Sequence, residues 1–205
     1  MKHEWKKHEK ELYGVKQMPR VVEVSKQNYI MISGKGNPND VDFSNRVEAL
    51  FPLAHGIKMA YKAMAVKEKL EDIVHDFSVY PLEGIWEQKE GGELVKEKLE
   101  YTIMIRQPDF IRPEVVNMAL EKLKKKKPNP LLSEIVFDAI KDGKCIEILH
   151  IGPFDDEPAS FEKMDEFARQ NGLCRIQSSH REIYLTNAKR VLKSKMQTIL
   201  RYQVS

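Results

Sequence analysis

The chain of 205 residues has no long apolar stretch and only two cysteines. No apolar run approaches the roughly 18 residues that a membrane-spanning helix requires, which excludes a transmembrane protein. The N-terminal residues lack the apolar core and the small-residue cleavage site of a secretion signal. Cys145 and Cys174 lie far apart and form no CxxC motif. We therefore expect a reduced, cytoplasmic protein with two unpaired structural thiols and no membrane contact.

The sequence also has no strong excess of either charge. Lysine and arginine total 34 against 31 aspartates and glutamates, a net charge of +3. This balance gives no reason to expect nucleic-acid binding. The one basic cluster, Lys124 to Lys127, follows an amphipathic pattern and precedes a proline. We interpret it as the last turn of a helix, with a phosphate-binding patch as the alternative.

Motifs for metals, nucleotides and serine nucleophiles are missing as well. The six histidines form no HExxH pair and no zinc spacing with cysteine. Gly34-x-Gly36 follows an expected strand, but Asn39 stands where the dinucleotide fingerprint needs its third glycine. There is no GxSxG and no Walker sequence. We therefore expect no metal and no cofactor.

Hydrophobic patterns divide the chain into helices and strands. Residues 1–14 predict a short charged helix ending at Gly14. We expect strands at 20–33, 77–86, 99–105, 144–150, 181–185 and 195–204, and helices across 43–70, 112–127 and 161–168. Pro52 and Gly56 punctuate the first of these longer helices. Residues 90–93 predict a hairpin connection, and 131–140 a short apolar segment.

The order strand, glycine turn, helix, strand, strand occurs twice, which indicates an internal duplication. A fixed offset pairs Ile30 with Ile148 and Gly34 with Gly152. We expect a helical extension at 1–19 and one domain at 20–205. Within that domain the pattern predicts module one at 20–110, connecting helices at 111–142 and module two at 143–205.

Strand alternation gathers aromatic residues of both copies on one face. Gly84-Ile85-Trp86 matches Glu182-Ile183-Tyr184 in pattern. We expect Ile85 and Ile183 to pack on the helices, and the opposite faces to line one cleft. The candidate ligand-binding residues of this cleft are Tyr80, Leu82, Trp86, His180, Glu182 and Tyr184. Large rings and a carboxylate suit flat organic ligands, including cations.

These residues resemble the GyrI-like small-molecule-binding proteins, which are related to the effector-binding domains of multidrug-responsive transcription regulators. The resemblance rests on the segment Pro81-Leu82-Glu83-Gly84-Ile85-Trp86, on the turn Gly152-Pro153-Phe154 and on Arg181-Glu182-Ile183-Tyr184-Leu185. It implies an α+β fold. Two duplicated strand-helix-strand-strand modules would form a curved antiparallel sheet with helices on its convex side and a central ligand cleft.

The resemblance also implies chemistry. Some stand-alone GyrI-like proteins hydrolyse the cyclopropane ring of DNA-alkylating natural products. By that likeness Glu182 would be the general base of a detoxifying hydrolase, and Trp86 and Tyr184 would hold a planar ligand. Tyr80 or His180 would polarise the ligand carbonyl. Glu182 and Trp86 are thus the candidate catalytic residues.

The alternative is a protein that binds aromatic ligands without changing them. It would be a ligand scavenger, an effector-binding partner of a separately encoded protein, or a gyrase modulator. Because only residues 1–19 precede the first expected strand, we expect no DNA-binding domain and no direct nucleic-acid contact. Trp5 and Leu12 predict either packing onto the module or a homodimer contact.

Overall fold

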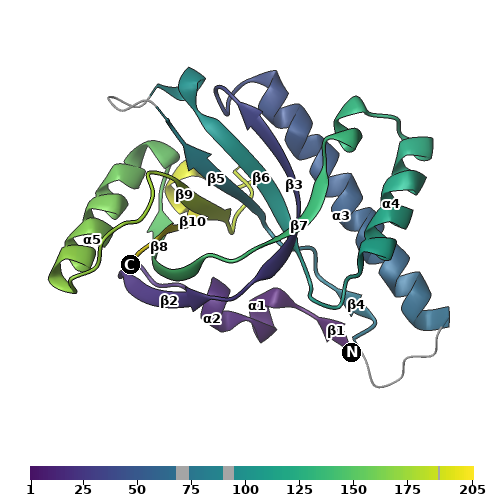
Figure 1. The fold of residues 1–205 in the computed structure, drawn as a ribbon, viewed down its shortest axis with the longest axis horizontal. Helices are drawn as coiled ribbons and strands as arrows, with labels where there is room; N and C mark the ends of the chain where they lie inside the picture. Colours follow the sequence, from purple (N-terminus) through teal and green to yellow (C-terminus); the bar gives the residue numbers. More distant parts are fainter. Residues whose placement is uncertain (68–73, 90–94, 189) are drawn as a thin grey trace.

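One eight-stranded antiparallel sheet organises the protein (Figure 1). The computed structural model describes residues 1–67, 74–89, 95–188 and 190–205. The sheet has the order β2-β8-β10-β9-β5-β6-β3-β7. Its strands are β2 (Arg20–Val24), β3 (Gln27–Lys35), β5 (Leu82–Glu87), β6 (Glu100–Gln107), β7 (Val136–Ile140), β8 (Gly143–Ile151), β9 (His180–Tyr184) and β10 (Gln197–Gln203). Two short parallel strands, β1 (Lys2–His3) and β4 (Asp76–Phe77), form a separate pair.

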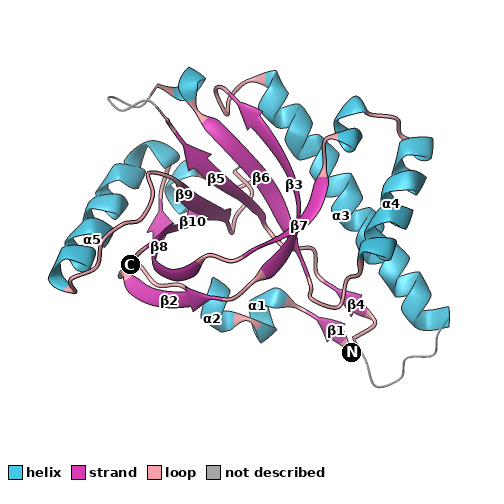
Figure 2. Ribbon diagram, in the orientation of Figure 1, coloured by secondary structure: helices cyan, strands magenta, loops and turns pink. Residues whose placement is uncertain are grey.

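The helices lie around this sheet (Figure 2). The α-helices are α1 (Trp5–His8), α2 (Lys10–Tyr13), α3 (Val41–Lys67), α4 (Pro113–Lys126) and α5 (Glu157–Gln170). Short 3-10 helices are η1 (Lys96–Lys98), η2 (Pro130–Ser133), η3 (Phe154–Asp156) and η4 (Lys193–Lys195). The basic cluster predicted to end a helix does so, with Lys124, Lys125 and Lys126 in the last turn of α4.

The predicted duplication is present in the fold. The first repeat is β3-α3-β5-β6, and the second is β8-α5-β9-β10. In each repeat the last strand lies between the other two, so β6 separates β3 from β5 and β10 separates β8 from β9. The inner strands β5 and β9 pair with one another, which joins both repeats into one sheet.

The sheet register corrects the predicted offset by two residues. Residues directly opposite one another on three neighbouring strands are Ile32, Ile103 and Gly84 in the first repeat. The equivalent residues of the second repeat are Ile148, Leu200 and Glu182. The equivalent of Gly152 is therefore Gly36, and both have positive φ, whereas Gly34 lies two residues earlier. Likewise Ile32, and not Ile30, matches Ile148. An error of two residues keeps every side chain on the same face, so alternation alone does not reveal it.

Helix α3 continues through Pro52, although the sequence predicted an interruption there. Proline removes one helical hydrogen bond and normally kinks or breaks a helix. Here the helix is held by burial on both sides of the proline, because Leu50, Leu53 and Ile57 are fully buried against the sheet. The tail of the predicted helix, including Leu70, lies outside the described residues, as does the predicted hairpin connection at 90–93.

Two predicted strands are each divided in the structure. Residues 20–33 form β2 and β3, which lie far apart in the sheet, and residues 77–86 contain the end of β4 and most of β5. Strand β2 pairs with β8 of the second repeat, while β7, from the expected connecting region, pairs with β3 of the first. Continuous β-branched residues predict extended backbone but do not show where the chain changes its partner.

The N-terminal residues pack onto the domain instead of forming one helix. They form β1, α1 and α2 in succession. Trp5 and Tyr13 are buried, and the Trp5 indole N–H donates to the carbonyl of Val79 at 3.0 Å. Leu12 packs against the same core. Of the two predicted roles for Trp5 and Leu12, packing onto the module is confirmed within the chain.

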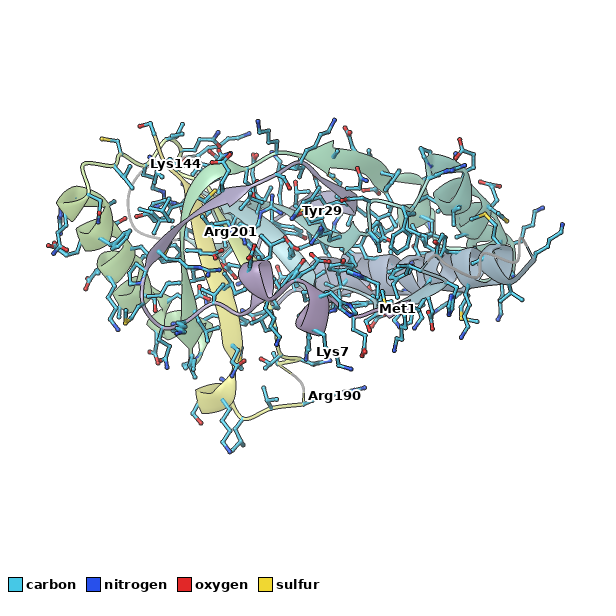
Figure 3. All side chains as sticks on the ribbon, turned by 90° about the horizontal axis from the view of Figure 1, so that it is seen from below. Met1, Lys7, Tyr29, Lys144, Arg190 and Arg201 are labelled. Carbon is cyan, nitrogen blue, oxygen red and sulfur yellow. The ribbon has the colours of Figure 1, made fainter. Side chains whose placement is uncertain are left out.

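One face of the sheet, here called the ionic face, carries a paired set of buried charges. Arg181 donates to Glu83 at 2.9 Å and to Asp142 at 2.8 Å. Arg201 donates to Glu147 at 2.8 Å, and Arg20 reaches the other oxygen of Glu147. Tyr29 and Arg201, labelled in Figure 3, are both buried, and the Arg181 guanidinium lies over the Tyr29 ring. These mutual pairs offset the cost of removing the charges from water.

Several features are absent from the described residues. No helix among them is long and apolar enough to cross a membrane. No three His, Cys, Asp or Glu side chains in these residues are grouped to hold a metal ion. Cys145 is buried and Cys174 is exposed, and both are free thiols. The exposure of Cys174 differs from the expected structural role.

The buried pairs of the ionic face predict the effect of removing Glu147. Glu147→Ala removes the nearer carboxylate of the buried Arg201 and leaves it only Asp142, at 3.7 Å. We expect the free energy of unfolding to fall by about 3–5 kcal/mol. Urea unfolding followed by circular dichroism measures this change. Glu23→Ala, at an exposed position of neighbouring β2, is the matched control. Equal unfolding midpoints for both variants would contradict the assigned role of the pair.

Candidate functional site

The junction of β5 and β9 brings four predicted site residues together. Gly84 lies directly opposite Glu182, and Trp86 lies directly opposite His180. Tyr184 follows Glu182 by two residues and so projects to the same face. The strands lie side by side in the middle of the sheet (Figure 1). Trp86, His180, Glu182 and Tyr184 therefore form one cluster, here called the junction cluster.

A directed chain of hydrogen bonds connects the junction cluster. The indole N–H of Trp86 donates to the hydroxyl of Tyr184 at 2.8 Å. Because indole is only a donor, the Tyr184 oxygen is the acceptor, and its own O–H donates to Glu182 Oε2 at 2.8 Å. His180 Nε2 lies 2.9 Å from Glu182 Oε1. Both carboxylate oxygens of Glu182 thus have fixed partners.

The surroundings keep Tyr184 a phenol. Burial and the adjacent Glu182 carboxylate raise the pKa of Tyr184 well above its usual value. The hydroxyl consequently remains a hydrogen-bond donor over the whole physiological pH range. It supplies the ionised form of Glu182 with a donor that pH does not remove.

Aromatic side chains from the helices and from β6 surround the junction cluster. The Phe43 ring of α3 lies 5.7 Å from the Trp86 ring, and Tyr101 of β6 lies 5.2 Å from it. The Phe154 ring of η3 lies 5.8 Å from Tyr184. Phe161 of α5 meets His180 at 4.8 Å. Glu182 is consequently a carboxylate enclosed by rings, with only 9% of its surface exposed.

These contacts correct the predicted facing of the sheet. The junction cluster lies on the same face as α3 and α5, here called the helix face. The sequence pattern predicts instead that the helices pack on Ile85 and Ile183 at the opposite side. Ile85 and Ile183 instead project to the ionic face, since they lie opposite Arg181 and Glu83. Alternation separates the two faces of a strand, but it does not tell which face the helices cover.

Two predicted ligand-binding residues do not join the cluster. Tyr80 lies before the start of β5, and its hydroxyl donates to Glu9 and lies 3.1 Å from His3. The Arg106 guanidinium lies over its ring. Tyr80 is therefore part of the N-terminal packing, and burial with the nearby Glu9 raises its pKa. Leu82 shares the helix face with Gly84 but packs, half-buried, against the main core.

Glu157 is a site residue that the sequence analysis missed. It begins α5 and is 6% exposed, and its Oε1 has no hydrogen-bond partner among the described residues. Burial, with the negative charges of Glu182 and Asp155 adding to it, raises the pKa of Glu157 to about 9. A glutamate in a first helical turn is common, because it complements the helix dipole. Because an N-terminal helical glutamate has this ordinary explanation, nothing in the sequence marks Glu157 as a second acid near Glu182.

Glu182 lines neither of two surface hollows, although His180 lines the second of them. One of about 320 Å³ is lined by residues of β3, β5 and β6, including Ile85 and Thr102. Another of about 210 Å³ reaches the ionic face, where its lining includes Arg181 and Arg201. The two arginines that line the second hollow already pair with carboxylates.

Solved structures share this fold over nearly the whole chain. A conserved protein from Listeria innocua is 34% identical, with a TM-score of 0.89, covering 99% of this chain and 100% of that one. A protein described as a hydrolase from the same organism is 32% identical, with a TM-score of 0.87 and complete coverage of both chains. The C-terminal domain of EcmrR is 13% identical, with a TM-score of 0.56, covering 92% of this chain and 97% of that one, and shares the fold.

Comparison with family models and with curated proteins gives the remaining findings. No curated protein matches the chain. The model of the GyrI-like small-molecule-binding domain matches residues 17–203, which include both repeats and the junction between them. With a match of that length and full-length relatives above 30% identity, the chain belongs to the GyrI-like family of small-molecule-binding domains.

Proposed function

We propose that the protein binds planar, amphipathic aromatic molecules at the junction cluster and hydrolyses those that carry a strained cyclopropane ring. The observation that carries this proposal is Glu182, a carboxylate enclosed by rings and held by two fixed partners. A relative of the same length and 32% identity is described as a hydrolase, which supports enzymatic chemistry in this chain. The biological role would be detoxification of DNA-alkylating compounds.

The aromatic residues are suited to hold a flat ligand. Trp86 and Tyr184 offer large faces with few rotatable bonds, so ordering a ligand against them costs little side-chain entropy. Their polar atoms are already engaged with one another. The rings therefore present apolar surface to a ligand, while Glu182 supplies the negative charge that favours cationic or hydrogen-bonding groups.

Glu182 would act as the general base. Polar partners at both oxygens orient the carboxylate toward the proton that it would accept. In the reaction, the oxygen of a water molecule bonds to a ring carbon as one carbon–carbon bond breaks. Glu182 takes the proton that the water loses. The product is one water heavier than the substrate.

Entry of a ligand would require movement of side chains. Trp86 and Glu182 are only 5% and 9% exposed, so the rings above them must separate before a ligand reaches the carboxylate. Phe154 is 43% exposed and touches Tyr184, which makes it the outermost of these rings. An ion pair of Lys96 with Asp155 connects η1 with η3 beside it. Displacement of η3 would open the path.

A mass-spectrometric time course with a cyclopropane-bearing aromatic alkylator tests the proposal. We expect wild type to accumulate a ring-opened product one water heavier, and Glu182→Gln to lower the rate by roughly 100-fold or more, because the amide cannot accept the proton. Glu114→Gln, exposed on α4, is the matched control. Intact ligand retained by wild type would instead favour the alternative, a binding protein without chemistry.

The position of Trp86 depends on Gly84, which gives a second test. A Cβ at Gly84 would lie 2.6 Å from the Trp86 indole nitrogen and 3.3 Å from the Tyr184 hydroxyl. Gly84→Ala must therefore displace the indole and break its bond to Tyr184. We expect weaker ligand binding and an altered emission of Trp86, measured in a Trp5→Phe background because the chain has two tryptophans. Unchanged emission and unchanged ligand affinity would contradict the proposal that Trp86 contacts the ligand.

A further inference from the structure

We propose that Glu157 is the acid partner of Glu182, a neutral carboxylic acid that protonates the ligand carbonyl while Glu182 activates water. This inference rests on the hydrolysis proposed above and adds the second group that the reaction needs. It assigns the carbonyl-polarising role, for which the sequence suggested Tyr80 or His180, to a residue on the helix face.

The geometry of Glu157 points to a ligand. Its side chain is 94% buried, yet Oε1 has no hydrogen-bond partner in the described part of the chain. A buried polar atom without a partner costs free energy and calls for an explanation, such as a catalytic role or a bound water or ligand. Phe154, three residues before Glu157, contacts Tyr184, and Phe161, one helical turn after it, contacts His180, so Glu157 lies beside the junction cluster. The free oxygen therefore belongs to the junction cluster.

The two carboxyl groups have opposite environments. Glu182 receives the Tyr184 hydroxyl on one oxygen, and its other oxygen lies 2.9 Å from His180 Nε2, so both oxygens have polar partners. The charged groups that act on Glu157 are the acids Glu182 and Asp155. Lys96 is the cation nearby, and it forms an ion pair with Asp155. Burial and like charge both favour the neutral form of Glu157. One group is thus suited to accept a proton and the other to donate one.

The previously expected polarising groups are otherwise engaged. Tyr80 lies before β5 and donates its hydroxyl hydrogen to Glu9 of the N-terminal segment. His180 Nε2 lies 2.9 Å from Glu182 Oε1 and is engaged with that carboxylate. Among the described residues near the junction cluster, Glu157 has a carboxyl oxygen that no protein group uses.

The reaction balances with these two residues and one water. Glu157 gives its proton to a carbonyl oxygen that is conjugated with the cyclopropane. The electrons of the breaking carbon–carbon bond move toward that oxygen, which becomes a hydroxyl, and the water oxygen bonds to the released ring carbon. Glu182 takes the water proton and afterwards returns it to Glu157. The net change is addition of one water.

The pH dependence of turnover tests the acid role. In wild type we expect kcat to fall above about pH 9, where Glu157 loses its proton. Glu157→Gln should lower kcat by roughly 100-fold or more with KM nearly unchanged, and should abolish this alkaline fall. Glu162→Gln, exposed on the same helix, is the control and should behave as wild type.

The outcomes separate the two proposals. Turnover by wild type with an unchanged rate and unchanged alkaline fall in Glu157→Gln overturns the acid role and leaves the hydrolysis standing. An absence of turnover by wild type overturns the hydrolysis and with it the acid role. Circular dichroism of each variant verifies that a lost rate does not come from unfolding.

The proton on Glu157 has a readout that needs no substrate. Its pKa is raised in the folded state from an ordinary value of 4.5 to about 9, so between these values the folded state holds a proton that the unfolded state has lost. The free energy of unfolding should therefore fall as pH rises through this window. Urea unfolding at several pH values should show a weaker fall in Glu157→Gln. Equal slopes of unfolding free energy against pH in wild type and Glu157→Gln would overturn the proposal that Glu157 is neutral in the folded state.

Discussion

The pairing of β5 with β9 is the constraint on which the rest of the structure depends. In the described sheet the two repeats meet at this ladder. On the helix face it sets Gly84 against Glu182 and Trp86 against His180. On the ionic face the same ladder carries the buried pair of Arg181 with Glu83. A shift of the register by one residue would exchange the two faces, and it would bury the arginine among the rings.

The sequence predicted much of the fold because hydrophobic periodicity is local. It indicated the amphipathic α4 and α5, the central strands and the duplication, and the family resemblance supplied the pairing of the two modules. The sequence pattern placed the helices on the wrong face of the sheet and gave an offset between the repeats that was wrong by two residues. Neither error changes the alternation of side chains along a strand, so alternation could not reveal it. Trp86, His180, Glu182 and Tyr184 converge as expected, since they share strand parity. Tyr80 does not, because it precedes β5 and packs with residues that are 70 or more positions earlier in the chain.

Buried charged groups have different partners on the two faces of the sheet. On the ionic face the carboxylates of Glu83, Asp142 and Glu147 meet arginine guanidinium groups, and mutual neutralisation makes that region a structural core. On the helix face the partners of Glu182 are a phenol and a histidine, and Glu157 brings a second acid. Charge that is paired stabilises the fold, whereas charge held without a strong cation retains the capacity to act on a ligand.

The match of Gly84 with Glu182 makes the centre of a duplicated fold asymmetric. Where one repeat has no side chain, the equivalent position of the other has a carboxylate, so the pseudo-twofold axis relates an empty position to a charged one. The space above Gly84 is filled by the indole of Trp86 from its own strand. A ligand lying across the axis therefore meets apolar surface at one end and an acid at the other. At the proposed site, this difference between two similar halves would give a flat molecule one favoured orientation.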